Sequence, residues 1–170
     1  MLNQIEIIKH ISKSLPIGYR LYVKEHPLMI IREWRKTSFY NEILSIPNVQ
    51  FLHHSIKTED VMTKCSLVIT INGASGLEAA IYKKPSILFS DFSYSILPAV
   101  HQIKSIDELP AAIRLSLRKK VDPIDVDKYL SEQTVEQIPI YNQSILFGIS
   151  RILFNLFPKV LYGYKTKHHS

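Results

Sequence analysis

The feature that most constrains the fold is an apolar, β-branched run, SLVITI at residues 66–71, which leads directly into a turn and a helical segment. Such a run is typical of a strand buried on both faces of a parallel sheet, because helices cover both sides of that sheet. The turn reads NGASG at residues 72–76, and residues 77–83 (LEAAIYK) have the composition of a helix. The chain is therefore expected to contain a strand–turn–helix unit of an α/β protein.

Strands and helices alternate on both sides of this unit. Short β-prone segments and helical patterns follow one another along the chain, at residues 5–12 (helix), 20–24 (strand), 38–45 (helix), 49–52 (strand), 59–64 (helix), 86–89 (strand) and 107–117 (helix). Successive βα units predict a Rossmann-like, doubly wound parallel sheet, in which ligands bind at the carboxyl ends of the strands. We expect this domain to cover residues 1–137, including a last helix at residues 123–137.

The chain then becomes apolar and aromatic. We expect residues 138–164 to form a C-terminal helix and residues 165–170 to form a mobile tail. The apolar residues cover more than a narrow stripe, which leaves three placements open. The helix docks on a partner domain, which we favour, or lies at a membrane surface, where basic and aromatic residues are common, or packs on the domain's own core.

Composition excludes several classes of protein. The chain has 46% hydrophobic and 21% charged residues, as ordinary globular proteins do. Its net charge of +6 suits an anionic ligand such as a nucleotide, whereas no nucleic-acid-binding motif occurs. No run of eighteen apolar residues and no signal-peptide pattern is present. With a single cysteine, Cys65, we expect a cytoplasmic protein, with contact to the inner face of the plasma membrane as an option.

The first candidate motif follows the strand at residues 20–24 and consists of Lys24, Glu25, His26 and Pro27. A histidine at a strand end, fixed by the following proline, can direct a ring N–H toward a phosphate oxygen. It can then stabilise negative charge on a departing nucleotide. A histidine in such a position is more often a residue that caps a loop, so the motif alone is a weak signal.

The second candidate motif is the turn itself, formed by Asn72, Gly73, Ala74, Ser75 and Gly76. Glycines allow a ligand to approach the backbone closely, the serine hydroxyl can donate to a phosphate, and a helix N-terminus carries partial positive charge. Glu78 is a candidate acceptor for ribose hydroxyls, or a cap of the same helix. The alternative is a purely structural turn.

Other motifs do not fit the sequence. A hydrolase elbow requires G-x-S-x-G, whose last glycine position is occupied by Leu77, and the P-loop and dinucleotide fingerprints are absent. His53-His54 lacks a cysteine or carboxylate at ligand spacing, and His168-His169 lies in the expected tail, where metal would bind only adventitiously, so we predict no metal site. One histidine of the first pair, or Ser55, is a candidate for the wall of a base pocket.

Taken together, these motifs resemble the capsule polysaccharide biosynthesis proteins. The residues that carry the resemblance are VKEHP (residues 23–27), Ser38-Phe39-Tyr40, Asn48-Val49, NGASGLEAA (residues 72–80), KKPSILF (residues 83–89) and Tyr94. That family includes Kdo transferases that act on capsule lipid anchors, and it is distantly similar to bacterial GT-B sialyltransferases. The resemblance implies the C-terminal, donor-binding half of a GT-B fold. It also implies a CMP-linked, Kdo-like sugar as substrate, with no cofactor.

The resemblance also implies roles for individual residues. His26 would contact the donor phosphate as the catalytic residue, Ser75 would share that phosphate, and Glu78 would lie near the nucleoside. Ser90 stands where the family often has glycine. The family's general base comes from an N-terminal half, so we expect a partner chain to supply it, together with the site for a glycan or lipid-linked acceptor.

The sequence thus predicts the nucleotide-sugar-binding half of a capsular polysaccharide glycosyltransferase, and leaves open whether the chain is an enzyme on its own. Two alternatives stand beside this prediction. One is a non-catalytic sugar-nucleotide-binding module in capsule assembly or export. The other is a UDP-sugar epimerase-like domain, since that group shares the GT-B architecture.

Overall fold

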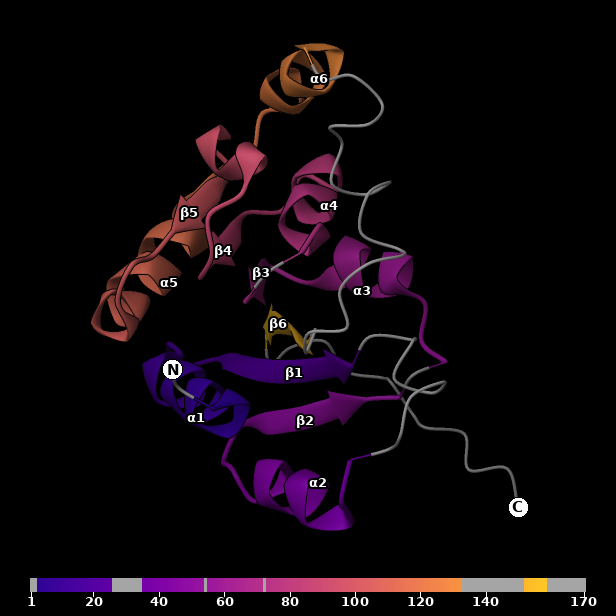
Figure 1. Cartoon of the computed structure of the whole chain (residues 1–170), viewed down its shortest axis with the longest axis vertical. Coiled ribbons are helices and arrows are strands. Elements are labelled where there is room, and N and C mark those ends of the chain that lie inside the picture. Colours follow the sequence, from indigo (N-terminus) through magenta and orange to yellow (C-terminus); the bar gives the residue numbers. More distant parts are fainter. Residues whose placement is uncertain (1–2, 26–34, 54, 72, 133–151, 159–170) are drawn as a thin grey trace.

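The computed structural model describes residues 3–25, 35–53, 55–71, 73–132 and 152–158 of the chain, and these form one six-stranded sheet with helices on both faces (Figure 1). The strands are β1 (Tyr19–Glu25), β2 (Val49–Leu52), β3 (Leu67–Thr70), β4 (Ser86–Leu88), β5 (Val100–Gln102) and β6 (Ile152–Pro158). The helices are α1 (Gln4–Ser14), α2 (Thr37–Leu44), α3 (Thr58–Lys64), α4 (Ser75–Ile81), α5 (Leu109–Arg118) and α6 (Pro123–Glu132), with 3₁₀ turns η2 (Ser93–Ile96) and η3 (Ile106–Glu108).

The sheet has the strand order β2-β1-β6-β3-β4-β5. β1 runs parallel to β2, and β3, β4 and β5 run parallel to one another. β6 is antiparallel to both β1 and β3, so these two strands point in the same direction. The carboxyl ends of all five parallel strands therefore lie along one edge of the sheet, and the predicted α/β class is confirmed.

Successive side chains of each strand point to opposite faces of the sheet and pack into a hydrophobic core on each face. On one face, Leu21, Val23 and Ile69 pack with residues of α1, α2 and α5. On the other face, Val68 packs with residues of α3 and α4, and Leu88 packs with residues of α4 and α6. Because both faces are covered, the strands can be apolar on both sides, as the run at residues 66–71 requires.

The prediction of a C-terminal helix is wrong for residues 152–158, which form β6 in the middle of the domain's own sheet. All seven residues of β6 pair with β1, from Tyr19 opposite Pro158 to Glu25 opposite Ile152, and four of them also pair with β3. A central strand is apolar on both faces, and such a run cannot be told from a buried helix by its periodicity. The sheet is consequently mixed where we expected a parallel one. The remainder of the predicted helix and tail lies outside the described residues.

Within the described ranges, none of the helices has the length and apolar character needed to cross a membrane.

Replacing Asn155 by proline tests the central position of β6. Asn155 lies opposite Tyr22 of β1 and Val68 of β3, and proline lacks the N–H that this ladder uses. We expect Asn155→Pro to lower the free energy of unfolding by about 3 kcal/mol, measured by urea denaturation. Asn155→Ala, which keeps the N–H, is the control. Equal midpoints for the two variants would show that β6 is not a central strand.

Candidate functional site

The two sequence motifs leave the sheet along the same edge. β1 ends at Glu25 and β3 ends at Thr70, and both ends lie level with the start of β6, because Lys24 and Thr70 each pair with Leu153. The loops that follow β1 and β3 thus begin two strand spacings apart, or about 10 Å. His26, Pro27 and Asn72 themselves lie outside the described residues.

Glu25 joins the two ends of the loop that carries His26. One carboxylate oxygen accepts a hydrogen bond from Nε of Arg35 at 3.0 Å, and the other accepts from the hydroxyl of Tyr40 at 2.9 Å. The guanidinium of Arg35 lies 4.4 Å from the ring centre of Phe39 on α2. Burial, followed by the hydrogen bond to the Glu25 carboxylate, raises the pKa of Tyr40. Glu25, which we predicted as a ligand-binding residue, thus has both oxygens engaged within the chain.

Lys24 points to the opposite face of the sheet from Glu25. Its ammonium donates a hydrogen bond to the carbonyl of Ile56 at 2.8 Å, and the residue is only 2% exposed. Burial lowers the pKa of Lys24, because removing the ammonium from water disfavours its charged form. The contact ties β1 to the β2–α3 loop and leaves a buried amine beneath the edge of the sheet.

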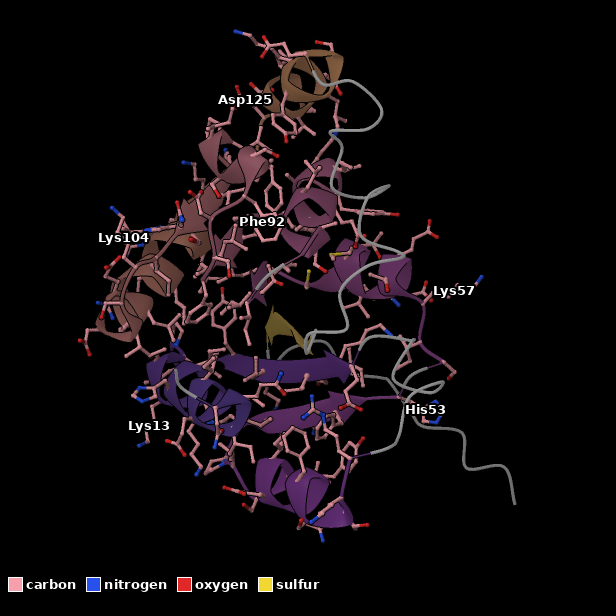
Figure 2. The ribbon with its side chains drawn as sticks, viewed as in Figure 1. Lys13, His53, Lys57, Phe92, Lys104 and Asp125 are labelled. Carbon is pink, nitrogen blue, oxygen red and sulfur yellow. The ribbon has the colours of Figure 1, made fainter. Side chains whose placement is uncertain are left out.

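The β2–α3 loop borders the same edge. Figure 2 labels His53 and Lys57 on this loop, on the side toward which the arrows of β1 and β2 point. Nδ1 of His53 lies 2.7 Å from the hydroxyl of Ser55, and both residues are exposed. The loop therefore places one of the predicted pocket-wall residues, Ser55, in contact with His53 near the candidate site. His54 lies outside the described residues.

The β3–α4 turn is supported from the inside of the protein. Gly73 has φ of 102°, a left-handed conformation that favours glycine, and its carbonyl accepts a hydrogen bond from the hydroxyl of Tyr94. A Cβ on Gly76 would lie 2.8 Å from Cε2 of Tyr94. The carbonyl of Gly76 accepts a hydrogen bond from the hydroxyl of Ser86 at 3.3 Å. The backbone conformation at Gly73 and the close packing of Tyr94 at Gly76 thus each explain why the turn has glycine at that position.

The predicted polar ligands of the turn begin α4. Ser75 is its first residue and Glu78 lies in its first turn, and both side chains are half-buried, as is Ala74 before them. Beside them, the hydroxyl of Ser90 donates to the carbonyl of Ile71 at 2.7 Å, which joins the segments that follow β4 and β3. Ser90, which stands where the family often has glycine, therefore stabilises the same edge.

Three supporting residues had no role in the sequence-based site: Tyr94, Arg35 and Ser86. Tyr94 was visible only as one residue of the family resemblance. A tyrosine in a polar segment after a predicted strand is a signal in itself, since a buried tyrosine hydroxyl needs a hydrogen-bond partner. Arg35 is separated from Glu25 by ten positions, and no spacing rule for a loop predicts that pair.

The described part of the chain offers neither a reactive thiol nor a cluster of metal ligands. The Cys65 thiol is buried, and burial raises its pKa to about 11, so at neutral pH it is protonated and unreactive. Among the residues that the structure describes, no group of three or more histidine, cysteine or acidic side chains could hold a metal ion. The edge instead presents hydroxyls, backbone groups and a buried amine.

The family model described as capsule polysaccharide biosynthesis protein matches residues 3–108, more than half of the chain. The chain belongs to this family. The capsule polysaccharide biosynthesis match runs from the residue that caps α1 to the end of η3 and so includes β1 to β5, the two motifs and Tyr94. No curated protein and no solved structure matches the chain significantly.

A double-mutant cycle on Glu25 and Arg35 tests the ion pair that joins the loop ends. Their side chains are only 11% and 25% exposed, so solvent screens the pair incompletely. We expect Glu25→Gln and Arg35→Met to show a coupling of about 1 kcal/mol in urea unfolding. Lys9 and Glu42, 3.2 Å apart but 35% and 49% exposed, are the control pair, and we expect their coupling energy to be smaller because solvent screens them more. A coupling no larger than that of the control would contradict the loop-closing role.

Lys24→Met tests the buried amine through its pH dependence. A lowered pKa means that folded Lys24 binds its proton less tightly than the unfolded chain, whose pKa is near the ordinary 10.5. In the window between the two values the unfolded state holds more protons, so stability rises with pH. We expect the parent to gain stability relative to Lys24→Met when urea unfolding is compared at pH 7 and pH 10. The exposed Lys57→Met controls for the loss of one positive charge. A constant difference between parent and Lys24→Met would refute the assignment.

Proposed function

We propose that this chain is the nucleotide-sugar-binding half of a capsular polysaccharide glycosyltransferase, with a Rossmann-like domain equivalent to the C-terminal half of a GT-B enzyme. The observation that carries the proposal is the shared edge: the loops after β1 and β3 leave the sheet side by side across β6, in a chain of the capsule polysaccharide biosynthesis family. A CMP-linked sugar is the proposed donor, and no separate cofactor takes part.

The topology supports a ligand at this place. With β6 left out, the strand order is 2-1-3-4-5, which is one of the two common doubly wound orders. In that order the direction of winding reverses between β1 and β3, and ligands bind outside the carboxyl ends of the strands at that reversal. The motif that contains His26 follows β1, and the motif that contains Ser75 follows β3. Both motifs thus flank the position that the fold class favours for a ligand.

The chemistry of the motif residues supports a phosphate group as the part that is recognised. The hydroxyl of Ser75 and the backbone of the turn from Asn72 to Gly76 are donors, and the missing side chain of Gly73 and the small one of Ala74 permit close approach. A ring N–H of His26, held by Pro27, would stabilise the charge that develops on the departing nucleotide. Glu78 would accept hydrogen bonds from the ribose hydroxyls.

Lys24 and Glu25 take supporting roles in this proposal. Glu25 closes the His26 loop through Arg35, and the amine of Lys24 holds the β2–α3 loop through Ile56. When protonated, Lys24 also adds positive potential beneath an anionic ligand. A partner chain would supply the general base and the glycan or lipid-linked acceptor. We place the reaction in the cytoplasm, with contact to the inner face of the plasma membrane as an option, and without nucleic acid.

Calorimetry with CMP, UDP and inorganic phosphate tests the proposal. We expect CMP to bind most tightly, and His26→Ala and Ser75→Ala each to weaken it about tenfold, the effect of one hydrogen bond to a charged group. Ser12→Ala is the control, because the hydroxyl of Ser12 donates to the carbonyl of Pro47. Pro47 precedes β2, at the end of the sheet where the parallel strands begin, far from their carboxyl ends.

Three results would change the assignment. Parent-like CMP affinity in both His26→Ala and Ser75→Ala would refute the site. A preference for UDP would favour the epimerase-like alternative. Tight CMP binding without donor turnover, when the chain is mixed with candidate N-terminal halves, would favour a non-catalytic module in capsule assembly or export.

A further inference from the structure

One buried side chain, Tyr94 of η2, contacts both ends of the turn that carries Ser75. Tyr94 is fully buried, its hydroxyl donates to the carbonyl of Gly73, and its Cε2 occupies the space that a Cβ on Gly76 would need. Ser75 lies between these two glycines in the sequence. Tyr94 therefore contacts the backbone on both sides of Ser75.

The tyrosine is itself held in one orientation. Its ring stacks on Phe92 with centroids 5.4 Å apart and an interplanar angle of 26°, and Leu77, Leu88 and Leu97 belong to the same cluster. Figure 2 shows Phe92 between α4 and the β4–β5 side of the sheet. Burial raises the pKa of Tyr94, so its hydroxyl stays protonated and remains a donor. A packed ring with a fixed donor makes a rigid support.

The hydrogen bond also fixes the direction of a peptide group. None of the described peptide bonds is cis, and in a trans peptide the C=O and the N–H point in opposite directions. Because the Gly73 carbonyl points at Tyr94, the N–H of Ala74 points away from it. Gly73 also has a φ of 102°, which glycine tolerates and most residues do not. Loss of the hydroxyl would free this peptide to rotate.

We propose that Tyr94 is a positioning residue for phosphate recognition. It orients the Gly73–Ala74 peptide and the Ser75 hydroxyl without touching the ligand. This inference rests on the proposed function and deepens it, because it names the residue that holds the phosphate-binding turn in place. Tyr94 then determines how much affinity the phosphate adds to a nucleoside.

The test compares CMP with cytidine, which lacks the phosphate, on the full chain. We expect the parent to bind CMP more tightly than cytidine, and Tyr94→Phe to lose about tenfold in CMP affinity with its cytidine affinity unchanged. Tyr129→Phe is the matched control. Tyr129 belongs to the same cluster, and its hydroxyl lies 2.8 Å from the hydroxyl of Ser93, which is not part of the turn, so both affinities should stay at the parent's values.

The outcomes separate this inference from the proposed function. A parent that binds CMP no better than cytidine overturns both. A parent that discriminates, with a Tyr94→Phe variant that discriminates equally, overturns the positioning role alone. Equal losses for CMP and cytidine indicate a general loosening of the fold and also overturn it. If Tyr94→Phe does not fold, Ser86→Ala removes the other side-chain support of the turn, and the same selective loss of CMP affinity is expected.

Discussion

The backbone pairing of β6 with its two neighbours is the interaction on which the rest of the structure depends. A buried strand must satisfy its N–H and C=O groups, and β1 and β3 each turn one edge toward the space that β6 fills. Pairing on both sides of β6 joins β2–β1 to β3–β4–β5 and fixes the register of β1 relative to β3. The loops after β1 and β3 begin at the same level because both strands are registered against the same residues of β6.

Buried and half-buried polar contacts support the candidate site. One such contact anchors each of the three loops that follow β1, β2 and β3: Glu25 with Arg35, Lys24 with the carbonyl of Ile56, and Tyr94 with the carbonyl of Gly73. Breaking a buried contact leaves a polar group without compensation, so these anchors resist movement. The arrangement follows a general rule for α/β proteins, in which a rigid sheet holds the loops that bind ligands.

Much of this fold could be predicted from the sequence, because local signals and tertiary structure agree from α1 to β4 and again at α5. Apolar, β-branched runs gave β3 and β4, and the small-residue turn gave the start of α4. β5 was missed because Val100–Gln102 is three residues long and contains histidine and glutamine. The sequence pattern of β6 predicts a helix, because a strand that lies between two others is apolar on both faces and lacks the alternation of an exposed strand. The sequence predicts Lys24 and Glu25 as members of one ligand site. The structure adds that their side chains contact different partners, because neighbouring residues of a strand point to opposite faces.

The late place of β6 in the sequence has a consequence for biosynthesis. Its contacts join residues 19–25 to residues 152–158, so the sheet closes only through pairings of very large sequence separation. Chains emerge from the ribosome N-terminus first, and every other strand is synthesised before the one that links them. During that interval β1 and β3 each have an unsatisfied edge, the kind of surface that promotes aggregation. High contact order predicts slow folding and a nascent chain that benefits from chaperones until residue 158 has left the exit tunnel.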